Sequence, residues 1–245
     1  RYIEYDVADF SGKKLSKDVD YVASINSNQV KDKGEYILTI TAKEGSAYSG
    51  AKTIRFAVVD IVQVTSETTE MKNGILSVSN NVEIKARINI IGDVMLILGE
   101  GTTLNAKNGI ELSEGNKLTI EGRGTLNATG DNYNSGIGAE KVGSLVVNDG
   151  VVNAMGGQSN GCGAGIGGSG NNSVGGNITI NGGTVRATGR CMAAGIGGGY
   201  YKDSGVYGKI LINGGMVTAI GGEYFNEDGE SVLWKGIGGN ISDNL

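Results

Sequence analysis

The sequence contains no histidine and no proline. Without histidine, Ser-His-Asp and Cys-His nucleophile systems, histidine zinc sites and the most frequent general base are excluded. Collagen-like and disordered glycine-rich chains are usually rich in proline too, so a chain with 44 glycines and no proline fits neither class. The two cysteines, Cys162 and Cys191, are too few for a disulfide scaffold or a four-thiolate metal site.

The net charge and the length of the hydrophobic runs narrow the possible partners and locations of the protein further. The net charge is -5 and no basic stripe is present, so we expect no nucleic-acid partner. No apolar run is long enough to cross a bilayer, so we expect no membrane insertion of this fragment. Since the chain starts at Arg1 and carries no signal peptide, we expect a fragment whose targeting segment and anchor lie outside it.

Residues 1–60 contain few glycines and form short alternating runs at 21–25, 35–42 and 52–60. This pattern predicts a small all-β module. Its "FSGK", its Asp20–Tyr21 pair and above all "GSAYSGAKTIRF" at 45–56 resemble bacterial immunoglobulin-like repeats. That resemblance implies a spacer or stalk without catalytic residues, and we place the domain boundary between 1–60 and 61–245.

From Ile61 onward the sequence repeats itself. Five segments, beginning at Met95, Lys117, Ser144, Asn177 and Lys209, each read as a strand, a tight turn and a second strand. Alternation assigns four residues of each copy to an inner face. The inner sets are Leu96, Leu98, Leu104 and Ala106; Leu118, Ile120, Leu126 and Ala128; Leu145, Val147, Val152 and Ala154; Ile178, Ile180, Val185 and Ala187; and Ile210, Ile212, Val217 and Ala219.

A Gly-Ile-Gly unit follows four of these copies and supplies a third short strand. We therefore predict an all-β fold, a right-handed parallel β-helix of about six rungs, with Ile137, Ile166, Ile196 and Ile237 in one internal ladder. The glycines of these units suit a corner of the solenoid, because glycine readily adopts positive φ and lets neighbouring backbones approach closely. A phosphate loop is disfavoured, because no unit is followed by Lys-Ser/Thr or by a helical period.

One outer face is unusually apolar. The outward positions of the first strands are expected to be Ile97, Thr119, Val146, Thr179 and Leu211. Such a row predicts a covered face, with the N-terminal module, a loop or a second copy of the chain as the cover.

The segment "GNITINGGTVRATG" at 176–189 resembles the rungs of bacterial β-helical carbohydrate-binding proteins of the cell surface. The resemblance implies a non-catalytic carbohydrate-binding or adhesion module, secreted or on the cell surface, with a glycan or surface polysaccharide as partner. Some members bind Ca²⁺ through an Asp before Gly-Ile. Here Ser135, Ala164, Ala194 and Lys235 stand at that position, so we expect no cofactor and no metal.

Aromatic residues gather in the long loops of the last two rungs. They are Tyr200, Tyr201, Tyr207, Tyr224, Phe225 and Trp234. Aromatic rings combine an apolar body with a polar tip, which suits contact with sugars. We take these six as candidate ligand-binding residues, with capping of the open end of the solenoid as the alternative role.

Two further functions stay open, a carbohydrate-active enzyme and a purely structural stalk. A glycosidase needs two carboxyl groups roughly 5–10 Å apart. Loop acids that could supply them are Asp131, Glu140, Asp203, Glu223, Glu227 and Asp228, although we predict solvated loop charges and no catalytic residue. Cys162 and Cys191 lie 29 residues apart in a register that differs by one residue, so we expect neighbours in space and leave the bond open.

Overall fold

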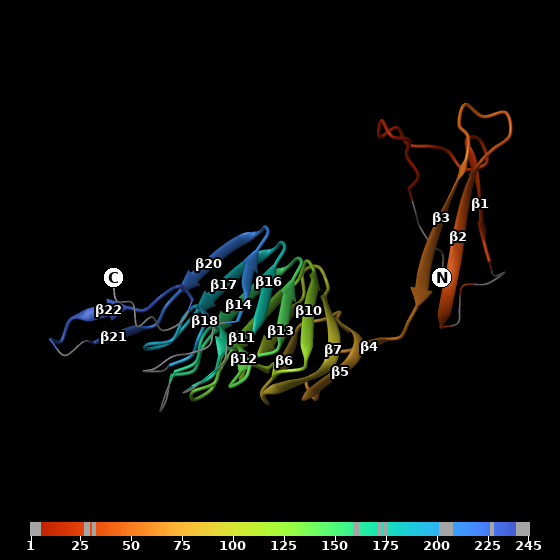
Figure 1. Ribbon diagram of the computed structural model, residues 1–245. Coiled ribbons are helices and arrows are strands. Elements are labelled where there is room, and N and C mark those ends of the chain that lie inside the picture. The colour runs from red at the N-terminus through yellow and green to blue at the C-terminus, as the bar shows by residue number, and fades with distance from the viewer. Residues whose placement is uncertain are drawn as a thin grey trace. The chain divides into compact units, whose positions relative to one another are not determined.

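The computed structural model describes residues 6–26, 30, 33–158, 162–170, 173, 176–200, 208–225 and 228–238 (Figure 1). The chain divides into two compact units, Arg1–Asp60 and Ile61–Leu245, at the point where the composition changes. Every regular element in the described parts is a β-strand. Accordingly, none of these residues forms a helix suited to cross a membrane.

The first unit is a three-stranded antiparallel sheet. It contains β1 (Tyr21–Ile25), β2 (Gly34–Ala42) and β3 (Ala51–Val58), in the order β1-β2-β3. Tyr21, Tyr36 and Leu38 are buried on one face of the sheet. An immunoglobulin-like sandwich requires two sheets, and the described residues of this unit form one, so that assignment stays a prediction.

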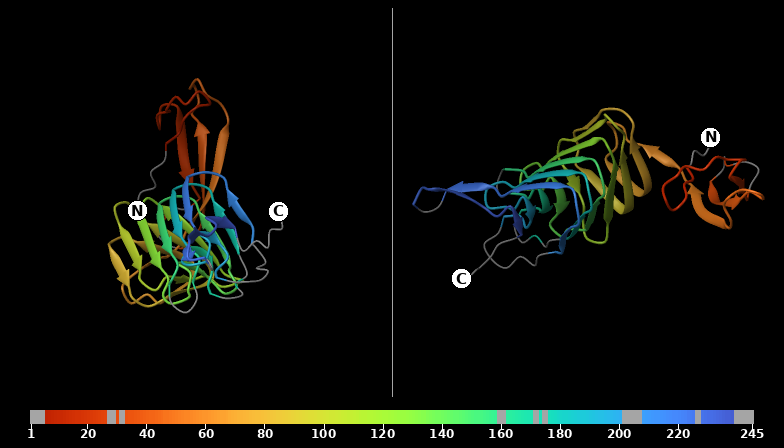
Figure 2. Two further views of the ribbon diagram at one scale, coloured as in Figure 1. Left: turned by 90° about the vertical axis from the view of Figure 1, so that its left-hand side faces the viewer. Right: turned by 90° about the horizontal axis from the view of Figure 1, so that it is seen from above.

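The second unit coils around a single core in three faces (Figure 2). Face one consists of β4 (Ile61–Gln63), β5 (Glu70–Val78), β7 (Ile88–Leu98), β10 (Lys117–Gly122), β13 (Ser144–Val147), β16 (Asn177–Ile180) and β19 (Ile210–Ile212). Face two consists of β6 (Val82–Ile84), β8 (Thr103–Ala106), β11 (Thr125–Thr129), β14 (Val151–Met155), β17 (Thr184–Thr188) and β20 (Met216–Ile220). Face three consists of β9 (Ile110–Glu111), β12 (Ile137–Ala139), β15 (Ile166–Gly168), β18 (Ile196–Gly197) and β23 (Ile237–Gly238).

Strands pair in parallel within each face, so the unit is a parallel β-helix, consistent with the predicted right-handed form. Face two is a six-stranded sheet, in agreement with about six rungs. The long strand β7 pairs with β9 at its start and with β10 at its end. Faces one and three are therefore joined into one curved sheet.

The predicted inner columns are confirmed from β10 onward. Leu118, Leu145 and Ile178 follow one another from rung to rung, and each is at most 1% exposed. On face two the alanines form a column of their own, namely Ala106, Ala128, Ala154, Ala187 and Ala219. In the last rung, Ile212 is 43% exposed, because no described strand stacks on β19 from the C-terminal side.

The pairing of the isoleucine ladder of face three is also confirmed, while Ile237 at its C-terminal end is 47% exposed rather than internal. Ile137 pairs with Ile166, Ile166 with Ile196, and Ile196 with Ile237. The ladder continues in the other direction to Ile110 and Ile88, which the repeat pattern did not reveal. Ile110, Ile137 and Ile196 have no exposed surface.

Glycine is required after Ile137, Ile166 and Ile196. Gly138, Gly167 and Gly197 have φ of 144°, 128° and 139°. A β-carbon on Gly167 would lie 2.0 Å from the carbonyl oxygen of Gly197, and one on Gly138 would lie 1.8 Å from that of Gly167. Each rung thus leaves no space for a side chain on the preceding one, as predicted.

The predicted register of β7 was wrong. The structure pairs Val94 with Leu118, Leu96 with Ile120 and Leu98 with Gly122. The reason is a longer turn: seven residues lie between Leu96 and Leu104, against five between their partners Ile120 and Leu126. A shift of two residues preserves the face, so all three aliphatic side chains remain inward.

The same shift changes the outward row of face one. Met95 lies beside Thr119, whereas Ile97 lies beside Glu121. The apolar row is therefore Ile61, Ile75, Met95, Thr119, Val146, Thr179 and Leu211. Thr119 is only 8% exposed and lies between Met95 and Val146 in this row.

Candidate functional site

The C-terminal aromatic residues lie largely on a β-hairpin. Strands β21 (Glu223–Phe225) and β22 (Ser231–Leu233) pair antiparallel, and the hairpin projects from the C-terminal end of the β-helix (Figures 1 and 2). Tyr224 and Trp234 contact each other edge to face with ring centroids 5.7 Å apart. On the opposite face of the hairpin, Phe225 is 72% exposed and Leu233 is 68% exposed.

The hairpin is held at its base by backbone hydrogen bonds. The Trp234 amide donates to the Gly222 carbonyl at 2.8 Å, and the Gly222 amide donates to the Ala193 carbonyl at 2.9 Å. A β-carbon on Gly222 would lie 2.1 Å from the Cys191 carbonyl oxygen, so glycine permits this close approach. The aromatic pair is therefore fixed to the rung that precedes it.

The remaining aromatic candidates lie apart from the hairpin or outside the described residues. Tyr200 is half-buried after β18, and its amide donates to the Cys162 carbonyl at 2.9 Å. Among the described residues, no ring contact joins Tyr200 to Tyr224 or Trp234. Tyr201 and Tyr207 fall outside the described residues.

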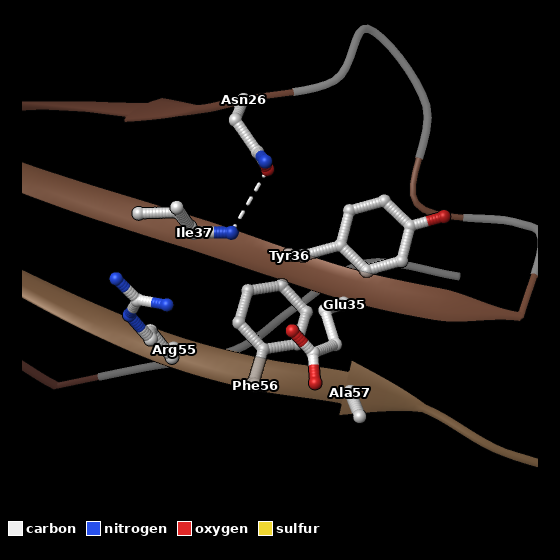
Figure 3. Close-up of a pocket in the computed structure, with 7 residues that line it drawn as sticks. All are labelled: Asn26, Glu35, Tyr36, Ile37, Arg55, Phe56 and Ala57. Carbon is white, nitrogen blue, oxygen red and sulfur yellow. Dashed lines mark hydrogen bonds between the residues drawn. The ribbon is translucent and has the colours of Figure 1, made fainter.

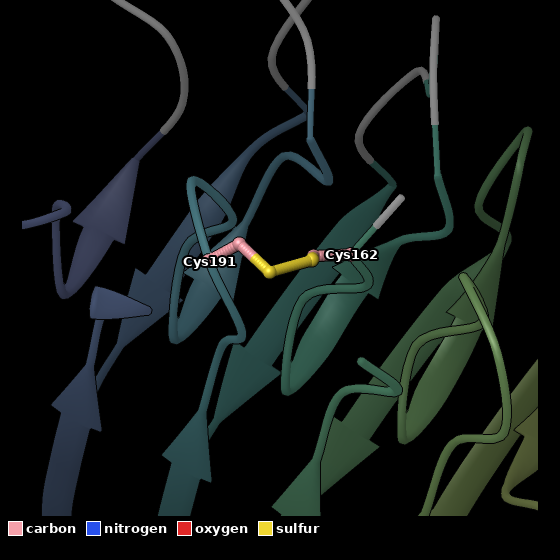
Figure 4. The surroundings of a disulfide bond; sticks show 2 residues. All are labelled: Cys162 and Cys191. Atoms are coloured by element: carbon pink, nitrogen blue, oxygen red, sulfur yellow. A yellow bond between two sulfur atoms is a disulfide. The ribbon is translucent and has the colours of Figure 1, made fainter. Parts of the chain in front are cut away.

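The two cysteines form a disulfide between loops of adjacent rungs (Figure 4). Their Cα atoms are 5.8 Å apart, as expected for neighbours in successive rungs. Cys191 has φ of 46°, in the left-handed region. That conformation lies in a loop, which accommodates the one-residue difference in register.

Two of the loop acids that the structure describes accept local side-chain hydrogen bonds. Asp131 accepts a hydrogen bond from the Asn134 side chain at 2.7 Å, and Glu223 accepts one from the Ser231 hydroxyl. Glu140 and Asp228 are exposed, and Asp203 and Glu227 lie outside the described residues. Within the described ranges, no cluster of three or more Asp, Glu, Cys or His side chains could hold a metal ion.

A pocket of about 480 Å³ occurs in the first unit (Figure 3). Its lining comprises Asn26, Glu35, Tyr36, Ile37, Arg55, Phe56 and Ala57. The rings of Tyr36 and Phe56 stack with centroids 5.5 Å apart, and Asn26 accepts a hydrogen bond from the Ile37 amide at 2.8 Å. Glu35 is the one carboxylate among these lining residues, whereas glycoside hydrolysis uses two.

Arg87 is a structural residue that sequence analysis missed. Its guanidinium donates to Glu111 at 2.7 Å and to four backbone carbonyls, those of Asn108, Ile110, Ser135 and Gly138. All five N–H groups of an arginine are thereby used. Arg87 comes directly before the ladder residue Ile88, whereas in later rungs the residue before the ladder isoleucine is glycine. The replacement of this glycine by arginine was the available signal in the sequence.

Two rows of hydrogen-bonded asparagines run along the β-helix and were also missed. On face two, Asn127 donates to Asn105 and Asn153 donates to Asn127, both at 2.8 Å. At the turn between faces one and two, a second row joins Glu121, Asn148, Asn181 and Asn213. The recurrence of asparagine between the inner residues of "TLNA" and "VVNA" was the available signal.

Comparison with known proteins supports the fold. The family model described as beta helix repeat matches residues 118–139, 145–170 and 178–200. These matches fall on three successive rungs, and each spans a strand from all three faces. No curated protein and no solved structure matches the chain.

Proposed function

We propose that the chain is a non-catalytic glycan-binding or adhesion module of a bacterial protein that is secreted or held at the cell surface. The observation that carries this proposal is the hairpin β21–β22, which pairs Tyr224 with Trp234 on one face and exposes Phe225 and Leu233 on the other. Exposed large apolar side chains that cluster usually mark a binding surface.

Aromatic rings bind the C–H faces of sugars through apolar contact, while the hydroxyl of Tyr224 and the indole N–H of Trp234 are available as polar tips. The edge-to-face contact holds both rings in place before a ligand arrives, which lowers the entropy cost of binding. The disulfide between Cys162 and Cys191 supports an oxidising, extracellular compartment.

The test is glycan-array binding by the wild-type chain and by Trp234→Ala. We expect the variant to lose at least tenfold in affinity, with an unchanged melting temperature. Phe10→Ala in the first unit is the control, because Phe10 is a fully exposed aromatic residue outside the hairpin, and this variant should bind normally.

Three outcomes would contradict the proposal. An array without any bound glycan would remove the function itself. Normal binding by Trp234→Ala would remove the hairpin as the site. A large fall in melting temperature for Trp234→Ala would favour the capping role of the hairpin.

A further inference from the structure

The outer surface of face two carries a regular polar row. From rung to rung, Asn105 of β8, Asn127 of β11, Asn153 of β14, Arg186 of β17 and Thr218 of β20 lie in register. All five point outward, since the residues on either side of each belong to the inner columns. Parallel strands are spaced by about 4.8 Å, so the row repeats at that interval along the axis.

The residues that flank this row alternate in character. Four consecutive strands present, on either side of the row, Thr125 and Thr129, then Val151 and Met155, then Thr184 and Thr188, then Met216 and Ile220. One rung therefore offers hydroxyl groups and the next offers apolar side chains. The alternation has a period of two rungs, about 9.6 Å. We call the row and its flanks on β11, β14, β17 and β20 the face-two array.

The asparagines of the array retain unused hydrogen-bonding capacity. A side-chain amide has two N–H donors and two acceptor lone pairs. Asn127 uses one donor toward Asn105 and one acceptor toward Asn153. One N–H and one lone pair stay free for a ligand, while the ladder fixes the orientation of the amide in advance, which reduces the entropy cost of binding.

We propose that the face-two array binds an extended, uncharged β-1,4-linked glycan that runs along the axis of the β-helix; this inference rests on the proposed function and adds a second contact surface to it. In such a chain each ring is turned by half a revolution relative to the last. Its chemistry therefore repeats every two rings, and one ring advances by a distance close to one rung. When such a chain lies edge-on, the edge that bears the 2- and 3-substituents and the edge that bears the hydroxymethyl group alternate, and they then meet threonine rungs and apolar rungs in turn.

The charge of the array favours an uncharged ligand. Arg186 is the one charged residue among the array positions, and it lies near the C-terminal end of the row. At the other end, Lys107 forms an ion pair with Glu83 at 3.4 Å, which neutralises both. Polysaccharides with a carboxylate on every ring would find no matching row of cations.

The test is isothermal titration of the chain with β-1,4-linked hexasaccharides of glucose and of N-acetylglucosamine, with the α-1,4-linked glucose hexasaccharide as the mismatched ligand. Thr129→Arg places a bulky side chain on the array and leaves the asparagine ladder intact, because Thr129 is an exposed flank residue. Asn177→Arg on face one is the matched control, since Asn177 is likewise exposed and outward.

We expect at least one of the β-linked hexasaccharides to bind, Thr129→Arg to weaken that binding at least tenfold, and Asn177→Arg to leave it unchanged. Affinity should also rise from the disaccharide to the hexasaccharide as more rungs are contacted. Equal binding of the α-linked ligand would overturn the inference that the two-ring repeat of a β-1,4-linked chain matches the two-rung repeat of the array.

Failure of this inference is separable from failure of the proposed function. If Trp234→Ala abolishes binding while Thr129→Arg binds normally, the hairpin is the site and the array is not. If no hexasaccharide binds but the glycan array reveals another ligand, the array inference alone falls. The melting temperatures of both arginine variants should equal that of the wild type. If the melting temperature falls for Thr129→Arg alone, the lost binding results from impaired folding, and this outcome counts against the array.

Discussion

The disulfide between Cys162 and Cys191 gives the sharpest test of how the rungs are held together. We expect the double variant Cys162→Ser/Cys191→Ser to fold, because the inner columns do not depend on either sulfur. It should be less stable than the wild type, since the bond closes a loop of 29 residues. The chain-entropy model assigns a loop of that length about 3.6 kcal/mol at 25 °C.

The loss of stability in the double variant should be greatest in the rungs that the disulfide connects. In a solenoid each rung contacts only its neighbours, so stability is nearly a sum of local terms. The Tyr200 amide, which donates to the Cys162 carbonyl at 2.9 Å, should therefore exchange with solvent faster in the variant. The amide of Leu118, two rungs earlier than β18, should keep its protection.

Urea unfolding gives the magnitude and hydrogen exchange gives the location. Wild type in the presence of reductant should behave like the double variant, and the variant itself should not respond to reductant. A loss below about 1 kcal/mol, far under the entropic figure, would refute the reasoning. Two alkyl groups added to the unreduced wild-type chain, measured by mass spectrometry, would show that the bond is absent.

Two further predictions concern the third face. Ile196→Asp buries an unpaired charge between Ile166 and Ile237 and should unfold the rungs around it in circular dichroism, so a variant as stable as the wild type would contradict the ladder. Gly167→Ala should prevent stable folding of its rung, because the new β-carbon lies 2.0 Å from a carbonyl oxygen. Gly101→Ala is the control, since its φ of 72° is also positive but no atom lies within 4 Å, and it should cost only about 1–2 kcal/mol; equal losses for both variants would exclude the steric argument.

Sequence patterns predicted the β-helix because inner positions repeat chemically. Leucine, valine and isoleucine recur at the same offsets, and the alanine of each second strand marks one column without interruption. The register of β7 was the exception. Pattern matching aligned it through the second strand, and only the three-dimensional pairing reveals that the turn before Leu104 is two residues longer.

The outer surface was harder to predict, because its interactions connect different rungs. The contacts of Arg87 reach Gly138, 51 residues away, and no local pattern encodes them. The edge contact between Tyr224 and Trp234 likewise depends on the hairpin that returns the chain. Composition placed the aromatic residues in long loops but gave no information on which of them meet.

The two proposed contact surfaces follow from how a solenoid tolerates variation. The inner columns must be preserved in every rung, so differences between rungs accumulate in the outward residues and in the turns. The turns between faces two and three vary in length along the chain, from residues 107–109 after β8 to residues 221–236 after β20. The longest turn is the one that carries the aromatic hairpin. Face two itself has short, regular strands and keeps its alternation of threonine and apolar rungs. In the two proposals, an inserted loop supplies aromatic contacts at one end and the repeat supplies periodic contacts along the side, so one extended glycan would contact both surfaces.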